Sequence, residues 1–132
     1  MPAADSKKLA AIKARLSIPA FAAPMFLISG PDLVIEACKA GVIGAFPTLN
    51  ARPINVLEEW FKRITGELAA AERLNPGKVA PWAANLIVHK SNARFAPDFE
   101  LICEYKPEIV ITSLGSPERA APGVHSYGGL VF

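Results

Sequence analysis

The chain has 132 residues, of which 52% are hydrophobic and 20% charged, and its formal net charge is +2. This composition excludes a disordered tail, which would be poor in apolar residues, and the balanced charge gives no basic surface for nucleic acid. The apolar run 18–28 contains two prolines and is shorter than the ~18 to 20 residues of a membrane span. We therefore expect one globular domain with neither a nucleic-acid nor a membrane partner.

The cysteines and the N-terminal segment indicate a reducing compartment. Cys38 and Cys103 are too few for a disulfide scaffold or a CxxC zinc site, and their apolar neighbours predict buried free thiols. Charged residues within 1–16 interrupt the hydrophobic stretch that a secretory signal needs. The sequence thus favours a cytoplasmic protein without a metal site.

The first third of the chain predicts a helix followed by two strand–helix steps. Asp5 or Ser6 is a candidate cap for a short basic helix, and residues 18–25 suit a strand that runs into a tight loop. Ser29 is a candidate cap for a second helix, which Gly41 would end. One face of the first, basic helix holds Leu9, Ile12 and Leu16 at helical spacing.

The remaining segments continue the alternation. After a strand at 42–46, the stripe Leu57, Phe61, Ile64, Leu68 and Ala71 predicts a long helix over 54–73, with Glu58–Lys62 and Glu59–Arg63 as pairs on its exposed side. Further strands are expected at 82–88, 108–112 and 129–132, with helices at 97–106 and, weakly, 117–121.

This order predicts an α/β fold built from parallel strands. The strands lack two-residue alternation, which is typical of strands covered on both faces. Two architectures fit, an open doubly wound sheet or part of a (β/α)8 TIM barrel, and a last strand at 130–132 with no helix after it favours the second. We expect residues 1–132 to form one partial domain, the N-terminal half of such a barrel with about five parallel strands, truncated at the fifth strand.

Functional groups of parallel α/β folds gather on the loops that follow the strands. The candidate segments are 23–26, 47–50, 89–92 and 112–115, whereas the turn that holds His125 belongs at the opposite end. Asn85 lies inside an apolar strand, so its amide must find partners. It either bonds to a neighbouring strand or loop, or contacts a ligand. The small residues Ala22, Ala23 and Gly44 either admit a flat ring or fit a tapering core.

Several segments together resemble the nitronate monooxygenase family, formerly called 2-nitropropane dioxygenases. The similar segments, in chain order, are 18–25, 37–46, 85–92, 109–115 and 125–132. The resemblance implies a (β/α)8 barrel that binds FMN and oxidises alkyl nitronates or nitroalkanes with dioxygen to a carbonyl compound and nitrite. No GxGxxG or P-loop motif is present as another phosphate site.

The resemblance also implies roles for particular residues. Ala23, Pro24 and Met25 match the loop that lies against the flavin, and Asn85 matches an asparagine that contacts it. Thr112 and Ser113 could border the pocket. His89 is not implied by the resemblance, but its place on the same face makes it a candidate substrate contact, the alternative being a solvated loop residue.

The glycine-rich loop that carries the family's catalytic histidine, and the loops that bind the FMN phosphate, lie beyond the fifth strand, so we expect this chain to lack them and to be inactive alone. Two alternatives stay open: another FMN barrel, such as a flavin-dependent enoyl reductase, or a non-catalytic half-barrel that pairs through its open sheet edges, as a homo-oligomer or with another half.

Overall fold

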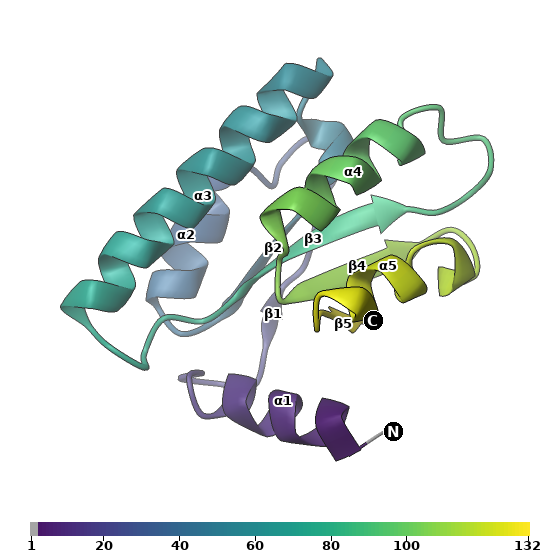
Figure 1. The fold of residues 1–132 in the computed structure, drawn as a ribbon. Coiled ribbons are helices and arrows are strands. Elements are labelled where there is room, and N and C mark those ends of the chain that lie inside the picture. Colours follow the sequence, from purple (N-terminus) through teal and green to yellow (C-terminus); the bar gives the residue numbers. More distant parts are fainter. Residues whose placement is uncertain (1–2) are drawn as a thin grey trace.

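A computed structural model describes residues 3–132, and its ribbon is drawn in Figure 1. Strands alternate with helices throughout. The strands are β1 (Phe21–Ala22), β2 (Ile43–Pro47), β3 (Trp82–Ile87), β4 (Ile109–Ser113) and β5 (Leu130–Val131). The helices are α1 (Ala3–Lys13), α2 (Pro31–Lys39), α3 (Ile54–Leu74), α4 (Phe95–Tyr105) and α5 (Ala121–Ser126), with short 3-10 turns η1 (Thr48–Asn50) and η2 (Pro117–Arg119).

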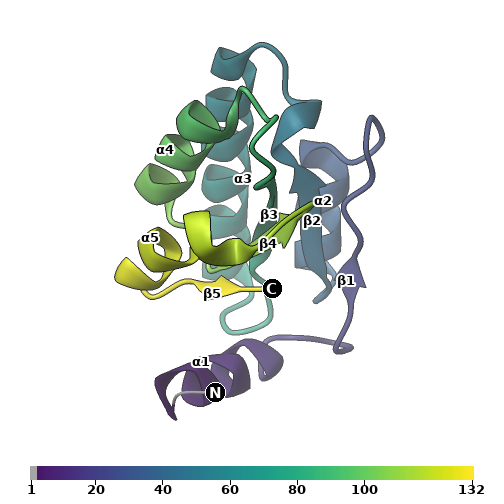
Figure 2. The same ribbon diagram turned by 90° about the vertical axis from the view of Figure 1, so that its right-hand side faces the viewer.

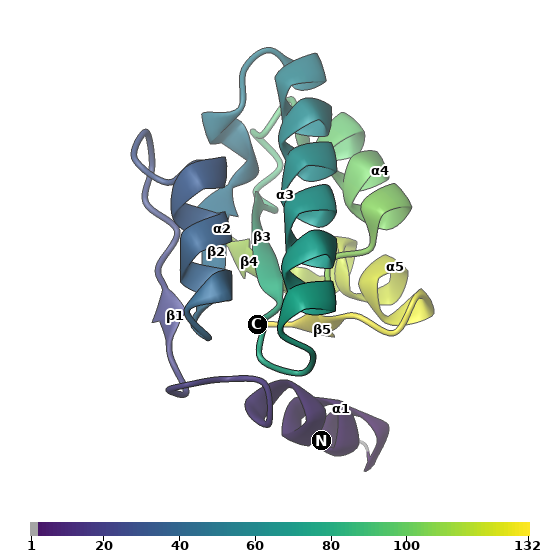
Figure 3. The ribbon, with the colours of Figure 1, turned by 90° about the vertical axis from the view of Figure 1, so that its left-hand side faces the viewer.

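The five strands form one parallel sheet in the order β1-β2-β3-β4-β5. Each connection therefore moves one strand in the same direction, and α2 to α5 lie side by side over one face of the sheet (Figure 3). A doubly wound sheet reverses direction and carries helices on both faces. The arrangement is that of part of a TIM barrel, as the sequence predicts.

The outer face of the sheet packs against α2, α3, α4 and α5 and forms the larger core. Phe61 of α3 lies at its centre, with ring centroids 5.0 Å from Trp82, 5.6 Å from Tyr105 and 6.0 Å from Phe46. The predicted stripe of α3 is buried as expected at Leu57, Phe61, Ile64 and Leu68, and Ala71 is partly buried against the same core. Aromatic contact therefore fixes how α3 and α4 lie on β2 and β3.

The inner face of the sheet holds a second, smaller core that α1 covers from the side where the strands begin. Its buried members are Ile12, Ile43, Ala45, Ala83, Ile109 and Leu130. Along β2, Ala45 belongs to this inner cluster and Phe46 to the outer one, so a strand that reads as continuously apolar serves two cores. The Lys8 ammonium also donates to the carbonyl oxygen of Gly128, which ties α1 to the turn before β5.

Several local predictions are wrong, for identifiable reasons. Residues 18–25 form a strand only at Phe21–Ala22, because Pro19 and Pro24 lack the N–H that a strand donates. Helix α1 already includes Asp5 and Ser6, so neither is its cap. Ser29 does not cap α2 either, since its hydroxyl accepts a hydrogen bond from the backbone N–H of Met25.

Two further differences concern side chains on helices. Glu58 pairs with Lys62 as predicted, but Arg63 pairs with Glu67 and Asp32 rather than with Glu59. His125 lies in the last turn of α5 rather than in a loop, although at the expected end of the fold. The tertiary approach of α2 to α3 decides the first difference, because it brings Asp32 to Arg63.

Two glycines are required by geometry. Gly41 ends α2 with φ +81°, a left-handed conformation that other residues adopt at a cost. A Cβ on Gly44 would lie 2.5 Å from the carbonyl oxygen of Val34 in α2. Gly44 therefore serves the close packing of helix on strand, which favours the packing alternative of the two that the sequence left open for this residue.

No helix within residues 3–132 combines the length and the apolar character that crossing a membrane requires.

Candidate functional site

The loops that follow β1, β2, β3 and β4 lie together at the end of the sheet opposite to α1 (Figure 2). This is the end where parallel α/β folds place their functional groups. Ala23 and Met25 are exposed there and Pro24 is partly exposed. The structure thus brings the three residues of the first loop to the same end of the sheet as His89 and Asn85.

The first loop is held in a tight turn by hydrogen bonds within residues 25–29. The backbone N–H of Ser29 donates to the carbonyl oxygen of Met25 at 3.0 Å, and the Met25 N–H donates to the Ser29 hydroxyl at 2.8 Å. Leu27 between them has φ 64°, in the left-handed region. The turn leaves Met25, Phe26, Leu27 and Ile28 exposed by 40%, 58%, 68% and 71%.

Asn50, at the end of η1, clamps this turn from the second loop. Its Oδ1 accepts from the Leu27 N–H at 2.9 Å, and its Nδ2 donates to the carbonyl oxygens of Met25 and Ser29 at 3.0 and 2.8 Å. The sequence places Asn50 on the correct face but indicates no role for it. The signal was available in part, because an asparagine directly after a buried strand is a common loop-bridging residue.

Asn85 is 8% exposed and bonds to the neighbouring strand. Its Nδ2 donates to the carbonyl oxygen of Ile111 and to the hydroxyl of Ser113, both at 3.1 Å. Within residues 3–132 its Oδ1 accepts no hydrogen bond, and this oxygen is not enclosed. Both alternatives from the sequence therefore stay open: the NH2 group has a structural role, and the carbonyl oxygen is free to accept from a ligand.

His89 is exposed and held by its own loop. The Ser91 backbone N–H donates to its Nδ1 at 3.2 Å, and the Ser91 hydroxyl lies 2.7 Å from the same nitrogen. Because Nδ1 accepts from a backbone N–H, the neutral ring carries its proton on Nε2. His89 can thus offer a donor toward solvent at this end of the sheet, and its role as a substrate contact stays a prediction.

A buried ion pair supports the second and third loops from behind. Arg94 donates to Asp98 Oδ1 at 2.7 Å and to the carbonyl oxygen of Ala51, next to the Asn50 clamp. Asp98 is fully buried, and burial raises its pKa, while the hydrogen bonds and the charge of Arg94 oppose that rise. Neither Asp98 Oδ2 nor the Thr48 hydroxyl has a partner within hydrogen-bond distance among the described residues. Arg94 therefore carries the stabilisation of this carboxylate.

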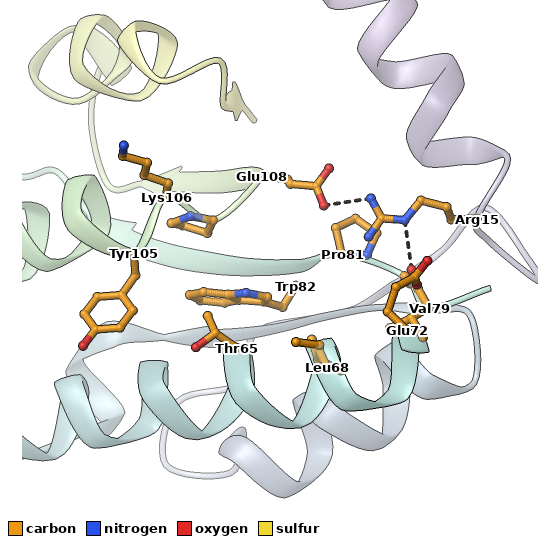
Figure 4. Close-up of a pocket in the computed structure, with 13 residues that line it drawn as sticks. Arg15, Thr65, Leu68, Glu72, Val79, Pro81, Trp82, Tyr105, Lys106 and Glu108 are labelled. Atoms are coloured by element: carbon orange, nitrogen blue, oxygen red, sulfur yellow. Dashed lines mark hydrogen bonds and ion pairs between the residues drawn. The ribbon is translucent and has the colours of Figure 1, made fainter. Parts of the chain in front are cut away.

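A cavity of about 300 Å³ lies at the other end, where β3 and β4 begin (Figure 4). Arg15 lines one side of it, donating to Glu108 at 2.7 Å and to the carbonyl oxygen of Val79 at 2.9 Å, and Trp82 forms part of its wall. It contains none of Ala23, Pro24, Met25, Asn85 or His89. The cavity is therefore separate from the candidate site.

Comparison with solved structures identifies the fold. The chain is similar to FabK from Thermotoga maritima, with 15% identity and a TM-score of 0.72 over 95% of this chain and 35% of FabK. The M276A mutant of the same FabK matches with 15% identity and a TM-score of 0.71, over 93% of this chain and 37% of the mutant. The chain thus spans about a third of the length of these structures, and at this identity the likeness concerns the fold alone.

No protein-family model matches the sequence. No curated protein matches it either.

Proposed function

We propose that this chain forms the first part of an FMN-dependent barrel oxidoreductase, with the ends of β1 and β3 as one wall of the flavin site. The observation that carries the proposal is the fold, because nearly the whole chain matches one portion of a FabK barrel. The segment 23–25 and Asn85 lie at the end of that portion where such barrels place their ligands.

The residues present fit a flat cofactor at this wall. The side chains at Ala22 and Ala23 are small, Met25 presents an exposed apolar side chain, and Asn85 keeps an open acceptor oxygen. FMN would supply the redox chemistry, while this chain would orient the ring and exclude water from one side. The Asn50 clamp would keep the first loop in the shape that meets the ring.

For the reaction we propose oxidation of alkyl nitronates, formed from nitroalkanes, by dioxygen to a carbonyl compound and nitrite. Its support is the series of sequence segments that resemble the nitronate monooxygenases. The likeness to FabK favours a second candidate, a flavin-dependent enoyl reductase. Nitrite release from a nitronate under air distinguishes the first reaction from oxidation of a reduced nicotinamide with an enoyl thioester. The chain alone with FMN is expected to do neither.

The free thiols of Cys38 and Cys103 support a cytoplasmic location.

The test is a titration of the 15N-labelled chain with FMN up to millimolar concentration, followed by amide chemical shifts. We expect weak binding, with a Kd on the order of 1 mM, since charge-assisted bonds to the phosphate supply much of such an affinity. The amides of Ala23, Met25 and Asn85 should shift most. Asn85→Ala should reduce these shifts, whereas Asn75→Ala, in the turn at the opposite end, should not. No shifts at the ends of β1 and β3 would overturn the proposal.

A further inference from the structure

The loop after β1 is attached to the rest of the fold through one side chain. β1 pairs with β2 at Phe21 and Ala22 alone, so the sheet does not hold the residues that follow. Among the described residues, each hydrogen bond that leaves the turn 25–29 ends on Asn50. The position of Met25, which belongs to the proposed flavin wall, therefore depends on where Asn50 lies.

Asn50 is itself placed by Arg94, which precedes α4. The guanidinium of Arg94 donates to the carbonyl oxygen of Ala51, and its Nη2 lies 3.5 Å from the carbonyl oxygen of Thr48. These two carbonyl groups flank Asn50 along the chain. A guanidinium presents several donors in one fixed plane, so it can hold the backbone on both sides of Asn50 at once.

Arg94 is fixed in turn by α4 and by β3. Its Nε and Nη2 donate to Oδ1 of the fully buried Asp98 at 3.1 and 2.7 Å. Its backbone N–H donates to Oδ1 of Asn92 at 3.0 Å, and Nδ2 of Asn92 donates to the carbonyl oxygen of Ile87 at the end of β3 at 2.8 Å. The loops after β3, β2 and β1 are thus connected in series, with Arg94 at the first junction and Asn50 at the second.

We propose that Arg94 is a positioning residue for Met25, acting through the backbone of η1 and the side chain of Asn50. A purely structural Arg94 would need only its positive charge beside Asp98. A positioning Arg94 also needs its contacts with the two carbonyl oxygens around Asn50. The consequence for flavin binding rests on the proposed function, whereas the coupling of Arg94 to Met25 is a property of the chain without ligand.

Two probes report on the first loop. The chain contains two methionines, so methyl-13C labelling of methionine gives two signals, and Met25→Leu identifies the one from Met25. The second probe is the Leu27 amide, which donates to Asn50 Oδ1 at 2.9 Å. Asn50→Ala should shift the Met25 methyl signal and speed the exchange of the Leu27 amide about fivefold, since one hydrogen bond is lost.

Arg94→Lys separates the positioning role from the structural one. A lysine keeps a positive charge beside Asp98, but its single nitrogen cannot reach Asp98 and both carbonyl oxygens. We expect this variant to keep the circular dichroism spectrum of the parent, yet to shift the Met25 signal in the same direction as Asn50→Ala does. Arg73→Lys, at the exposed end of α3, is the matched control and should leave the Met25 and Leu27 signals unchanged.

Because the contacts act in series, the two changes should not add. The double variant Asn50→Ala/Arg94→Lys should shift the Met25 signal no further than Asn50→Ala alone. Asn92→Ala, which releases the backbone of Arg94 but leaves the pair with Asp98 in place, should give a smaller shift in the same direction. The proposal is overturned if Arg94→Lys and Asn92→Ala both leave the Met25 signal as in the parent, or if the shifts add.

Addition of FMN separates this proposal from the proposed function. In the parent, FMN should shift the Met25 methyl signal, and at the same FMN concentration the shift should be about threefold smaller in Asn50→Ala and Arg94→Lys. If FMN leaves Met25 unchanged in the parent, the flavin wall is wrong, while the signals without ligand still decide the coupling. An equal response to FMN in the parent and both variants would overturn the part of Arg94 in flavin binding.

Discussion

The two faces of the sheet are buried in different ways. The outer face packs against four helices around Phe61, whose ring contacts side chains of β2, β3 and α4. The inner face is smaller and depends on α1, which reaches it through Ile12 only near the start of the strands. The outer face is thus covered by four helices, whereas the inner layer and the β1 edge leave apolar surface exposed.

The largest expected effect is at the outer core. Phe61→Ala removes an aromatic ring that is fully buried among Phe46, Trp82 and Tyr105, and should cost about 4 kcal/mol of unfolding free energy. Urea denaturation followed by circular dichroism measures the loss. Phe26→Ala, at a 58% exposed site, should change stability by about 0.5 kcal/mol or less. Equal losses in the two variants would contradict the assignment of the outer core.

The next effect is at the buried ion pair that supports the loops. Arg94→Ala leaves the Asp98 carboxylate buried without its partner and should cost about 3 kcal/mol at pH 7. Burial already raises the pKa of Asp98, and losing Arg94 raises it further. The variant should therefore recover stability as the pH falls through that raised pKa, because the folded state then binds a proton.

Arg73→Ala, at the exposed end of α3, is the control for this pH dependence and should show neither the loss nor the recovery. Denaturation midpoints between pH 4 and 7 provide the measurement. If Arg94→Ala loses the same stability at pH 4 as at pH 7, Asp98 stays charged without Arg94.

A smaller effect is expected at the inner face. Ile12→Ala removes the one α1 side chain that is fully buried against the sheet, and should cost about 2 kcal/mol. The loss should be below that of Phe61→Ala, because α1 can move and close the space. Hydrogen exchange should show faster exchange of α1 amides with α3 unchanged. If the exchange of α3 rises equally, the two cores are a single cooperative unit and the comparison fails.

The smallest effect concerns pH and Cys38. Its thiol lies between α2 and the sheet, donates to the Pro81 carbonyl oxygen at 3.4 Å, and has a pKa raised to about 11 from 9.0, mainly because of burial. The folded state thus keeps the proton between pH 9 and 11, while the unfolded chain loses it. Stability should be unaffected by this thiol below pH 9 and should fall by at most about 1.4 kcal/mol per pH unit above it.

Cys38→Ala removes this pH dependence, although its stability at pH 7 is lower because of the cavity that it leaves. The measurement is the denaturation midpoint of the two proteins from pH 8 to 10. Below pH 9 the two midpoints should differ by a constant amount, and above pH 9 this difference should change. A parallel decline of both proteins above pH 9 would assign the alkaline loss to other groups.

The sequence alone determined the order and type of the elements. Gly41, the α3 stripe and the apolar strands are local signals, since glycine conformation and helical periodicity act over a few residues. The same local signals located the loops that follow the strands, and with them 23–25, Asn85 and His89. The roles of these residues stay predictions, because a role depends on a ligand that local pattern does not describe.

The tertiary structure alone decided the contacts between distant segments. Asn50 holds residues 25–29, Arg94 supports Ala51, and Arg63 pairs with Asp32. Nothing in the spacing of these residues predicts such pairs, because each depends on how two loops or helices meet. The exposure of Phe26, Leu27 and Ile28 has the same origin. These residues are apolar in the sequence, but their exposure follows from where the loop after β1 lies.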